Sequence, residues 1–538
     1  MRPNTYRTRR NLLPGLTCAF FFCAGLALAP NLGIEDDEAL FASAIYRPRA
    51  ELYQIHIGRS HIPLMLMSYL GALKSLIYKP IFLAFGTGVW ALRVPMLLAG
   101  TFSVWLFFLL LRRIAGERAA WIGCALLAVD SSYLITVVFD WGPVALQHLF
   151  MIGGSLLLVR FYQQREDWAL AAGFLLFGLV LWDKALAVWM LSGMGLAAIL
   201  TLRRQIFDTL TLRRALIAVL AFSLGVLPLA IYNVQNQWGT FHGNLTRDTQ
   251  GIAAKALFLL NTESKGMFGW LTSPNWQTPQ PHLPQGLLQR ASAGISALAG
   301  EPHNFILAWA FGLALLLAPF AGRNALRAIT FSVIAMTVAW IQMAINASTG
   351  GSVHHTILLW PLPQIIIATS LAAASRRFGR AGMTAIAAVV ALVVASGALV
   401  INQYYVETLR FGGAQSWSDG IFALSNYVKD LPAKNFVSLD WGIMEPLRLL
   451  HKGRLPLLNG SDPVARPEMT EEDRKGANWL LSEPGNVFIT HTKPYEFFPG
   501  NSDRLVAFAA QSGLRQQPLA TISDRHNRQV YEVFKFVK

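Results

Sequence analysis

The sequence predicts a polytopic α-helical membrane protein with about eleven transmembrane helices, followed by a small soluble α/β domain. Of its 538 residues, 54% are hydrophobic and only 14% are charged, whereas a soluble globular domain has about 25% charged residues. Apolar runs of about 20 residues, the length that spans hydrocarbon as a helix, recur up to residue 404. Beyond residue 404 the composition becomes that of an ordinary soluble domain, which predicts a boundary between 1–404 and 405–538.

The individual spans follow from these apolar runs. Each of the two spans beside Asp183 is short for a transmembrane helix. The predicted spans are 11–31, 89–111, 118–138, 143–163, 168–183, 185–202, 213–233, 305–322, 326–346, 355–375 and 383–404.

Arginines support this arrangement independently, because they precede the first span and then cluster on alternate loops, as at Arg112, Arg113, Arg203, Arg204 and Arg376. Positive residues in short loops stay on the cytoplasmic side. We therefore expect a cytoplasmic N-terminus and, with an odd number of spans, a C-terminal domain outside. A bacterial inner (plasma) membrane is the predicted location. The net charge of +15 is explained by topology, and no nucleic-acid partner is implied.

The first span is expected to be a retained anchor. Its end resembles a signal-peptide cleavage site, Ala27-Leu28-Ala29, but Pro30 follows directly and its ring is a poor partner for cleavage. Cys18, Cys23 and Cys124 all fall inside predicted spans, so the exported regions contain no cysteine for a disulfide or a thiolate metal site.

Two exported loops are large. The loop 32–88 begins with four consecutive acids, Glu35 to Glu38, and its stretch 61–86 is apolar but interrupted by lysines and prolines, which suggests helices lying at the membrane interface. The loop 234–304 contains a plausible amphipathic helix at 285–299. Loops of this length are usually functional.

The tail 405–538 is predicted to be a small α/β domain. Strands are expected at 436–440, 487–490 and 529–536, and Thr470 with Asp473 is typical of a capping box that opens a helix to Leu481. Without a glycine-rich phosphate loop or a recognisable nucleophile motif, this domain is expected to stabilise the protein or to recognise an acceptor.

Charged and polar residues at the outer ends of spans form the candidate site. Acids in or beside spans are costly and usually face a cavity, and Lys184 is an exception to the charge asymmetry of the loops. A pocket that combines carboxylates with cations suits a lipid carrying a phosphate. The residues expected to converge on the outer face are Asp37, Glu38, Asp140, Lys184, His354 and His355.

Several short motifs then match one family in order. The acids with Ala-Leu-Phe-Ala (35–42) resemble the Asp-Glu motif of the glycosyltransferase C fold, especially the branch of the protein O-mannosyltransferases and the lipid A aminoarabinose transferase. HIPLMLMSYL (61–70), ALRVP (91–95), WDKAL (182–186) and HHTILLWPLP (354–363) resemble further motifs of this family, as does Asp140 after the third span. The resemblance covers roughly residues 10–400.

The resemblance implies a membrane enzyme that moves a sugar from a polyprenyl phosphate to a lipid, glycan or protein acceptor on the outer face, with inversion. It implies that Asp37 is the general base or the ligand of an ion that activates the acceptor, with Glu38 as its orienting neighbour. Asp140 would be a second acid, Lys184 the partner of the lipid phosphate, and Arg93 a phosphate partner or an anchor. His354 and His355 stand where the family has Arg-Tyr and would bind substrate. A divalent ion, Mg²⁺ or Mn²⁺, held by Asp37 and Asp140 is a further expectation.

Structural alternatives remain for each residue. The acidic cluster could belong to a solvated loop, and Asp140 could be the N-cap of the following helix. Lys184 could pair with Asp183 or extend its side chain to the headgroups. The histidines would suit carbonyl hydrogen bonds, and Asp130, with its neighbouring serines, a buried polar contact. At the level of function, the alternatives are a transporter or flippase for lipid-linked sugars and an assembly protein that displays the C-terminal domain.

Overall fold

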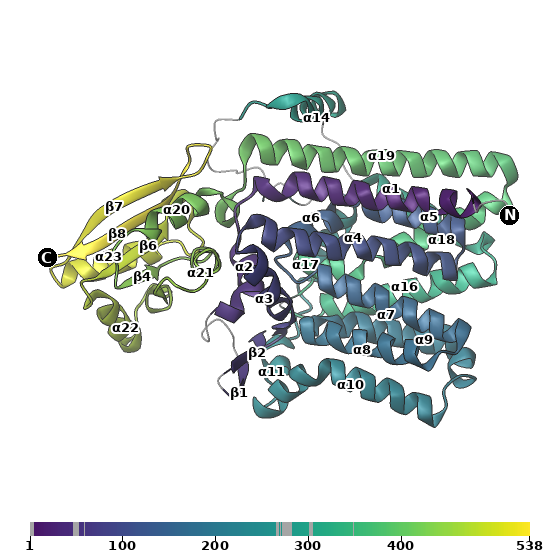
Figure 1. The fold of residues 1–538 in the computed structure, drawn as a ribbon, viewed down its shortest axis with the longest axis horizontal. Helices are drawn as coiled ribbons and strands as arrows, with labels where there is room; N and C mark the ends of the chain where they lie inside the picture. The colour runs from purple at the N-terminus through teal and green to yellow at the C-terminus, as the bar shows by residue number, and fades with distance from the viewer. Residues whose placement is uncertain are drawn as a thin grey trace.

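The computed structural model describes residues 5–46, 53–58, 60–264, 268, 271, 282–300, 305–347 and 349–538. It consists of a long helical bundle with a mixed α/β domain at one end (Figure 1). Helix α19 (Gly379–Phe411) runs along one side of the bundle and continues seven residues past the expected boundary at residue 404 before the chain enters the α/β domain.

The bundle is built from apolar helices, most of them joined by short turns. Helix α8 packs between α7 and α10, and the approach to α10 is close: a Cβ at Gly178 would lie 2.3 Å from the Phe222 carbonyl oxygen. Besides α19, the helices of the bundle, with their bounds, are α1 (Thr5–Leu28), α4 (Val89–Ile114), α5 (Glu117–Ala128), α6 (Ser131–Phe139), α7 (Ala145–Gln164), α8 (Asp167–Asp183), α9 (Val188–Phe207), α10 (Leu212–Gln235), α15 (Phe305–Leu317), α16 (Arg323–Ala344), α17 (Val353–Thr356) and α18 (Leu362–Arg377).

The expected count of eleven spans is not confirmed. Within the described ranges, eight helices are long and apolar enough to cross a membrane, or nine if α5 and α6, bent by 59° at their junction, form one span. Helix α8 has 17 residues and α15 has 13. At 1.5 Å per residue, a helix of 13 residues covers about 20 Å of a hydrocarbon core of about 30 Å.

The loop 32–88 differs from the expectation of interfacial helices. After the short helix α2 (Asp36–Ser43), residues 53–71 form an antiparallel sheet of β1 (Tyr53–Ile57), β2 (Ser60–Met67) and β3 (Leu70–Gly71), and only then does α3 (Leu73–Phe85) begin. Leu64, Met65 and Leu66 in β2 are all buried. A strand covered on both faces shows a continuous apolar run instead of alternation, which explains why its period was uninformative.

The loop 234–304 contains three short helices among its described residues. They are α11 (Gly239–Asn244), α12 (Ile252–Ser264) and α14 (Gly286–Ala299), and α14 lies where the amphipathic helix 285–299 was predicted. Helix α14 packs along the flank of α19, outside the main bundle (Figure 1).

The C-terminal part forms a five-stranded sheet in the order β5-β4-β6-β8-β7. Strands β4, β6 and β8 were predicted from the sequence, and the capping box of Thr470 and Asp473 is present at the start of α22. Strands β5 and β7 were not predicted. The elements are α20 (Gly420–Lys429), β4 (Asn435–Ser438), α21 (Met444–Leu450), β5 (Leu457–Asn459), α22 (Glu471–Leu481), β6 (Asn486–His491), α23 (Asn501–Gln511), β7 (Arg515–Ser523) and β8 (Gln529–Val537).

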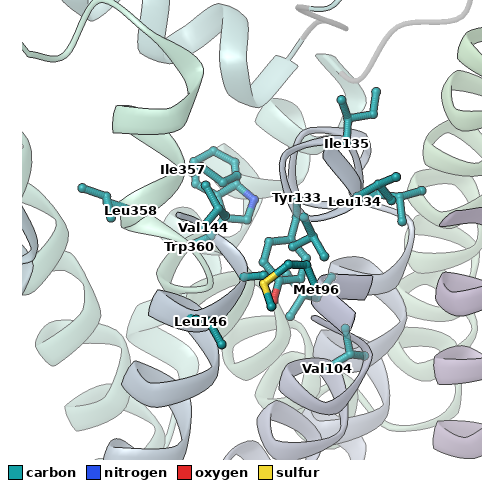
Figure 2. Close-up of a cluster of buried hydrophobic side chains, with 14 of the residues drawn as sticks. Met96, Val104, Tyr133, Leu134, Ile135, Val144, Leu146, Ile357, Leu358 and Trp360 are labelled. Carbon is teal, nitrogen blue, oxygen red and sulfur yellow. The ribbon is translucent and has the colours of Figure 1, made fainter. Parts of the chain in front are cut away.

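A large apolar core supports the end of the bundle where α2 and α3 lie. Figure 2 shows part of this core, in which side chains from α4, α6, α7 and the segment after α17 pack together. Ten of its residues are Met96, Val104, Tyr133, Leu134, Ile135, Val144, Leu146, Ile357, Leu358 and Trp360.

Candidate active site

The acidic cluster forms the N-terminus of α2, at the end of the bundle that faces the α/β domain (Figure 1). Glu35 is the N-cap residue, and its Oε2 accepts the backbone N–H of Glu38 at 3.0 Å. Carboxylates are favoured at a helix N-terminus because of its unpaired N–H groups and the helix dipole. Since successive helical residues point about 100° apart, Asp36, Asp37 and Glu38 face three different surroundings.

Glu38 faces the bundle, where it binds Arg93 of α4. The Arg93 Nε and Nη2 donate to the two carboxylate oxygens, each at 2.8 Å. Arg93 also donates to the backbone carbonyls of Ala29, Leu32 (3.0 Å) and Gly33 (2.6 Å). All five N–H groups of this guanidinium are therefore engaged. Arg93, for which phosphate binding and anchoring were both expected, serves as an anchor here, and Glu38 is held by it.

Asp36 faces the α/β domain. Its Oδ1 accepts the backbone N–H of Glu445 in α21 at 3.3 Å, and Glu445 in turn pairs with Arg448 at 3.0 Å. All three side chains are buried. Burial beside Glu445 raises the pKa of Asp36 well above its usual value. Asp36 thus belongs to the junction between the two parts of the chain.

Asp37 is the remaining acid of the first turn, and it is half-buried. Its carboxylate makes no hydrogen bond to any residue that the structure describes. Burial raises the pKa of Asp37 to about 6, although the positive charges of Lys184 and Lys74 act in the opposite direction. A carboxylate with a pKa near neutrality and without a fixed partner is suited to general base catalysis.

Asp140 is fixed by contacts on both oxygens. It ends α6 in a left-handed conformation (φ 41°), and its Oδ1 accepts the backbone N–H groups of Val144 and Ala145 at 2.7 and 2.9 Å, at the start of α7. Its Oδ2 lies 2.7 Å from the Lys74 Nζ. The contacts of Oδ1 agree with the N-cap alternative for Asp140. The contact of Oδ2 adds a buried ion pair with Lys74, which the N-cap alternative does not include.

Lys74 was missed in the sequence analysis, which placed it in an interfacial helix. It lies in α3, is only 1% exposed, and also donates to the Asp140 carbonyl oxygen at 3.0 Å. The available signal was a single lysine inside an otherwise apolar run, Ala-Leu-Lys-Ser-Leu. A lysine in such a run is expected to be buried, and a buried ammonium needs a charged partner.

Asp37 and Asp140 do not fit the expected divalent ion. The oxygens of Asp140 already bind two backbone N–H groups and an ammonium, whereas Mg²⁺ and Mn²⁺ require several free oxygen ligands. The described part of the chain also contains no group of three or more His, Cys, Asp or Glu side chains placed to hold a metal. Lys74 supplies the positive charge beside Asp140 instead.

Lys184 lies at the turn between α8 and α9 and is buried. Its Nζ donates to the carbonyl oxygens of Gly142 (2.8 Å) and His354 (3.2 Å), so one of its three N–H groups is left. Burial lowers the pKa of Lys184 to about 8, against the opposing charges of Asp183, Asp140 and Asp37. The neighbouring Asp183 carboxylate is buried and forms no hydrogen bond with a described residue, so a hydrogen-bonded pair with Lys184 is not formed.

The two histidines occupy the short helix α17. The Trp141 indole donates to His354 Nδ1 at 3.2 Å, and Ser352 Oγ lies 2.6 Å from the same nitrogen. Gly142 allows this approach, since a Cβ there would lie 2.5 Å from the His354 Cβ. The His355 ring lies against His354 with centroids 4.3 Å apart, and its Nδ1 is buried without a hydrogen-bond partner among the described residues.

Asp130 makes buried polar contacts, as the structural alternative for this residue expected. Its carboxylate accepts hydrogen bonds from the Trp360 indole at 2.7 Å, from Gln364 at 3.0 Å and from the backbone N–H of Tyr133 at 2.9 Å. These contacts satisfy it inside the bundle.

The structure therefore brings residues from distant segments into one cluster. Asp37 lies within the electrostatic influence of both Lys74 and Lys184, and Lys184 within that of Asp37, Asp140 and Asp183. Glu38 and Arg93 lie behind this cluster as anchors. Two carboxylates that make no hydrogen bond to a described residue, the half-buried Asp37 and the fully buried Asp183, lie within the electrostatic influence of two buried ammonium groups. Of these two acids, the less buried Asp37 suits proton removal next to a developing negative charge.

Comparison with known proteins agrees with the resemblance inferred from the sequence. Residues 73–232 match the family model described as dolichyl-phosphate-mannose-protein mannosyltransferase. No match was found among curated protein sequences.

Solved structures with similar folds were found. ArnT from Cupriavidus metallidurans in the apo state superimposes with a TM-score of 0.55 at 15% identity, over 96% of this chain and 98% of that one. The same protein bound to undecaprenyl phosphate gives a TM-score of 0.54 at 14% identity, with 97% of each chain covered. The arabinofuranosyltransferase AftD from Mycobacteria gives 0.52 at 14% identity, over 98% of this chain and 40% of AftD. The predicted relationship to the glycosyltransferase C fold is confirmed.

Proposed function

We propose that this integral membrane protein is a glycosyltransferase that moves a sugar from a polyprenyl phosphate to an acceptor hydroxyl, with inversion at the anomeric carbon. The observation that carries the proposal is the position of Asp37. It is the one acid of the α2 first turn whose carboxylate has no hydrogen bond to a described residue, and the positive charges of Lys74 and Lys184 act on it. The matching family model and the glycosyltransferase C fold support this class of donor.

The proposed reaction is a single displacement. Asp37 accepts the proton of the acceptor hydroxyl, and the acceptor oxygen forms a bond to the anomeric carbon. The bond between that carbon and the phosphate oxygen breaks, and the electron pair leaves with the polyprenyl phosphate. The remaining N–H of Lys184 and the charge of Lys74 stabilise this leaving group. Because attack and departure occur on opposite faces of the carbon, the configuration inverts.

The donor class is inferred from the neighbours. ArnT binds undecaprenyl phosphate, and the matching family model is described by a dolichyl-phosphate sugar. A lipid, a glycan or a protein can supply the acceptor hydroxyl in this scheme. No step in this scheme requires a divalent ion. The Asp140 carboxylate, which was expected to help bind the ion, is already paired with the Lys74 ammonium.

We also propose an orientation in the membrane. The alternation of arginines supports a cytoplasmic N-terminus and an α/β domain on the outer side of a bacterial inner membrane. The cluster around Asp37 lies at the end of the bundle next to the α/β domain (Figure 1). Transfer would therefore take place at the outer face.

The flippase alternative is less well supported. A transporter has to open its binding site to both sides in turn, whereas Lys74, Asp140 and Lys184 are held at one end of the bundle by buried contacts. A charged site fixed at one face favours chemistry at that face.

The decisive experiment compares Asp37→Asn with wild type and with Asp36→Asn. Asparagine keeps the shape of the side chain but removes the proton acceptor, so transfer should fall by roughly 10²–10⁴-fold while thermal stability is retained. In Asp36→Asn the amide oxygen still accepts the Glu445 N–H, so turnover should stay near that of wild type.

The assay measures sugar transfer from a polyprenyl-phosphate sugar by purified protein in detergent micelles, where no membrane separates donor from acceptor. A flippase would form no product in this assay. Undiminished turnover by Asp37→Asn would remove this residue from the mechanism.

A further inference from the structure

A separate cavity lies where the membrane bundle meets the α/β domain. Its volume is about 240 Å³, and none of its lining residues belongs to the Asp37 cluster. The walls come from the last turns of α19, the start of α14 with the segment before it, and the α/β domain. Six lining residues that matter here are His282, Gln285, Gln289, Ala293, Arg410 and Arg525.

The cavity has a cationic wall. Arg525 crosses the junction, because its Nε pairs with Asp419 at 2.8 Å and its Nη2 donates to the Asn31 carbonyl at 2.6 Å. Arg410, at the end of α19, forms no ion pair with any residue in the described ranges and is exposed. One guanidinium at the cavity is thus neutralised by a carboxylate and the other is not.

Neutral polar groups complete the wall. The His282 Nε2 lies 3.0 Å from the Arg525 carbonyl oxygen, which fixes its ring at the cavity. Behind it, at 4.4 Å between ring centroids, lies His526, which is buried and whose Nδ1 has no hydrogen-bond partner among the described residues. The N-terminus of α14, with Gln285 as its N-cap residue, adds the positive end of a helix of 14 residues. These groups together favour an anion.

The apolar face of α14 places the cavity at the membrane surface. Leu287, Leu288, Ile295 and Leu298 fall within one arc of about 100° on the helix, and they are 88, 68, 46 and 92% exposed. From another side of α14, the Ser292 carbonyl accepts a hydrogen bond from Asn402 of α19 at 3.0 Å.

Helix α14 lies against α19, which is itself a candidate span (Figure 1). An exposed apolar arc on a helix in this position suits contact with lipid, and the adjoining cavity then suits the depth of the lipid headgroups.

We propose that this cavity binds the phosphate-bearing headgroup of a membrane lipid, with Arg410 as its principal cation. A guanidinium recognises phosphate through paired N–H groups, and the helix N-terminus is a ready anion site. The immersed leucine arc favours a lipid over free phosphate, since it holds the cavity at the depth where lipid headgroups are concentrated. The site is distinct from the Asp37 cluster and does not depend on the reaction carried out there.

The test is native mass spectrometry of the full-length protein released from detergent micelles containing equal amounts of phosphatidylglycerol and phosphatidylcholine with the same acyl chains. We expect wild type to retain phosphatidylglycerol preferentially. Arg410→Gln should weaken its retention about tenfold or more, as for loss of a hydrogen bond to a charged group, and Arg410→Lys should restore part of it. The matched control is Arg203→Gln, at an exposed arginine near the other end of the bundle, which should leave retention unchanged.

A second variant tests whether retention needs the volume of the cavity as well as the charge of Arg410. Ala293→Phe fills the cavity without removing a cation, so it should also reduce retention, and an unchanged melting temperature would show that the fold is intact. A competition arm with excess inorganic phosphate distinguishes the two sources of the anion. Equal retention by wild type and Arg410→Gln would overturn the proposal, as would inorganic phosphate binding without preference for phosphatidylglycerol.

Discussion

The Glu38 carboxylate and the Arg93 guanidinium form two parallel hydrogen bonds, each 2.8 Å long, between α2 and α4. This fork separates the roles of two neighbouring acids. Glu38 is neutralised and fixed by Arg93, while Asp37, one residue earlier, points to a different side of the same helical turn. The anchor defines where Asp37 stands relative to Lys74 and Lys184.

Breaking this fork should destabilise the protein. Arg93→Ala leaves the buried Glu38 carboxylate without its partner, so the free energy of unfolding should fall by about 3–5 kcal/mol, measured by thermal or denaturant unfolding in detergent. Glu471→Ala, which removes the exposed i,i+4 pair with Lys475, is the control and should have little effect. Equal stability of the two variants would show that the fork does not anchor α2.

The pH dependence of transfer should report the ionisation of Asp37. Its pKa is raised from 3.8 to about 6 because the carboxyl is buried, so kcat/KM should rise as the pH increases through about 6 and the base loses its proton. The measurement is the pH–rate profile of the purified enzyme. A profile without a transition near pH 6 would contradict this ionisation.

Stability should change in the opposite direction. A group whose folded-state pKa is raised contributes stability that is fully present below its unfolded value and lost as the pH rises through its folded value. For Asp37 this window runs from pH 3.8 to about 6. Wild type should therefore lose stability relative to Asp37→Asn across this window, as measured by melting temperature. A constant difference between the two proteins would exclude this linkage.

The buried pair of Lys74 and Asp140 should behave as a unit. Lys74→Met leaves a buried carboxylate unpaired and should lower the free energy of unfolding by about 3–5 kcal/mol. Adding Asp140→Asn should recover part of this loss, because an amide no longer requires a cation. Transfer should stay low in the double variant, since the positive charge near the leaving phosphate is gone. Full activity of the double variant would limit Lys74 to a structural role.

The contact between Asp36 and Glu445 should couple the α/β domain to α2. Arg448→Ala removes the buried partner of Glu445, so the domain should dock less firmly, the connection at 412–419 should become more sensitive to protease, and turnover should fall. Arg466→Ala, whose pair with Asp473 is largely exposed, provides the control. Identical proteolysis of both variants and wild type would show that this junction does not hold the domain.

The proposed orientation can be tested by labelling. Positions 472 and 208 are both exposed and lie on opposite sides of the membrane in this scheme. Single cysteines there, in a background lacking Cys18, Cys23 and Cys124, should react with an impermeant maleimide from outside only at position 472. Labelling from outside at position 208 would overturn the orientation and place the Asp37 cluster on the cytoplasmic side.

Much of the architecture could be predicted because its signals are local. Apolar runs identify helices wherever they lie, and the strands at 487–490 and 529–536 and the Thr470 capping box are recognisable within a few residues. The strand β2 was missed because its conformation depends on segments that are distant in the sequence. Distant segments cover both faces of this apolar run, and the Trp182 indole donates a hydrogen bond to the Leu64 carbonyl oxygen at 2.9 Å. The spacing of apolar residues in the run therefore does not identify it as a strand.

By itself, the sequence determined that this chain is a membrane protein, that its arginines alternate between loops, and that acids gather after the first span. Only the tertiary structure decided which acid is available for chemistry. Glu38 is engaged by Arg93, Asp36 by the backbone of Glu445, and Asp140 by Lys74. These partners come from other segments of the chain. The reason is physical: a carboxylate is assigned its role by whichever donor and charge lie within a few ångströms, and chain folding alone sets those neighbours.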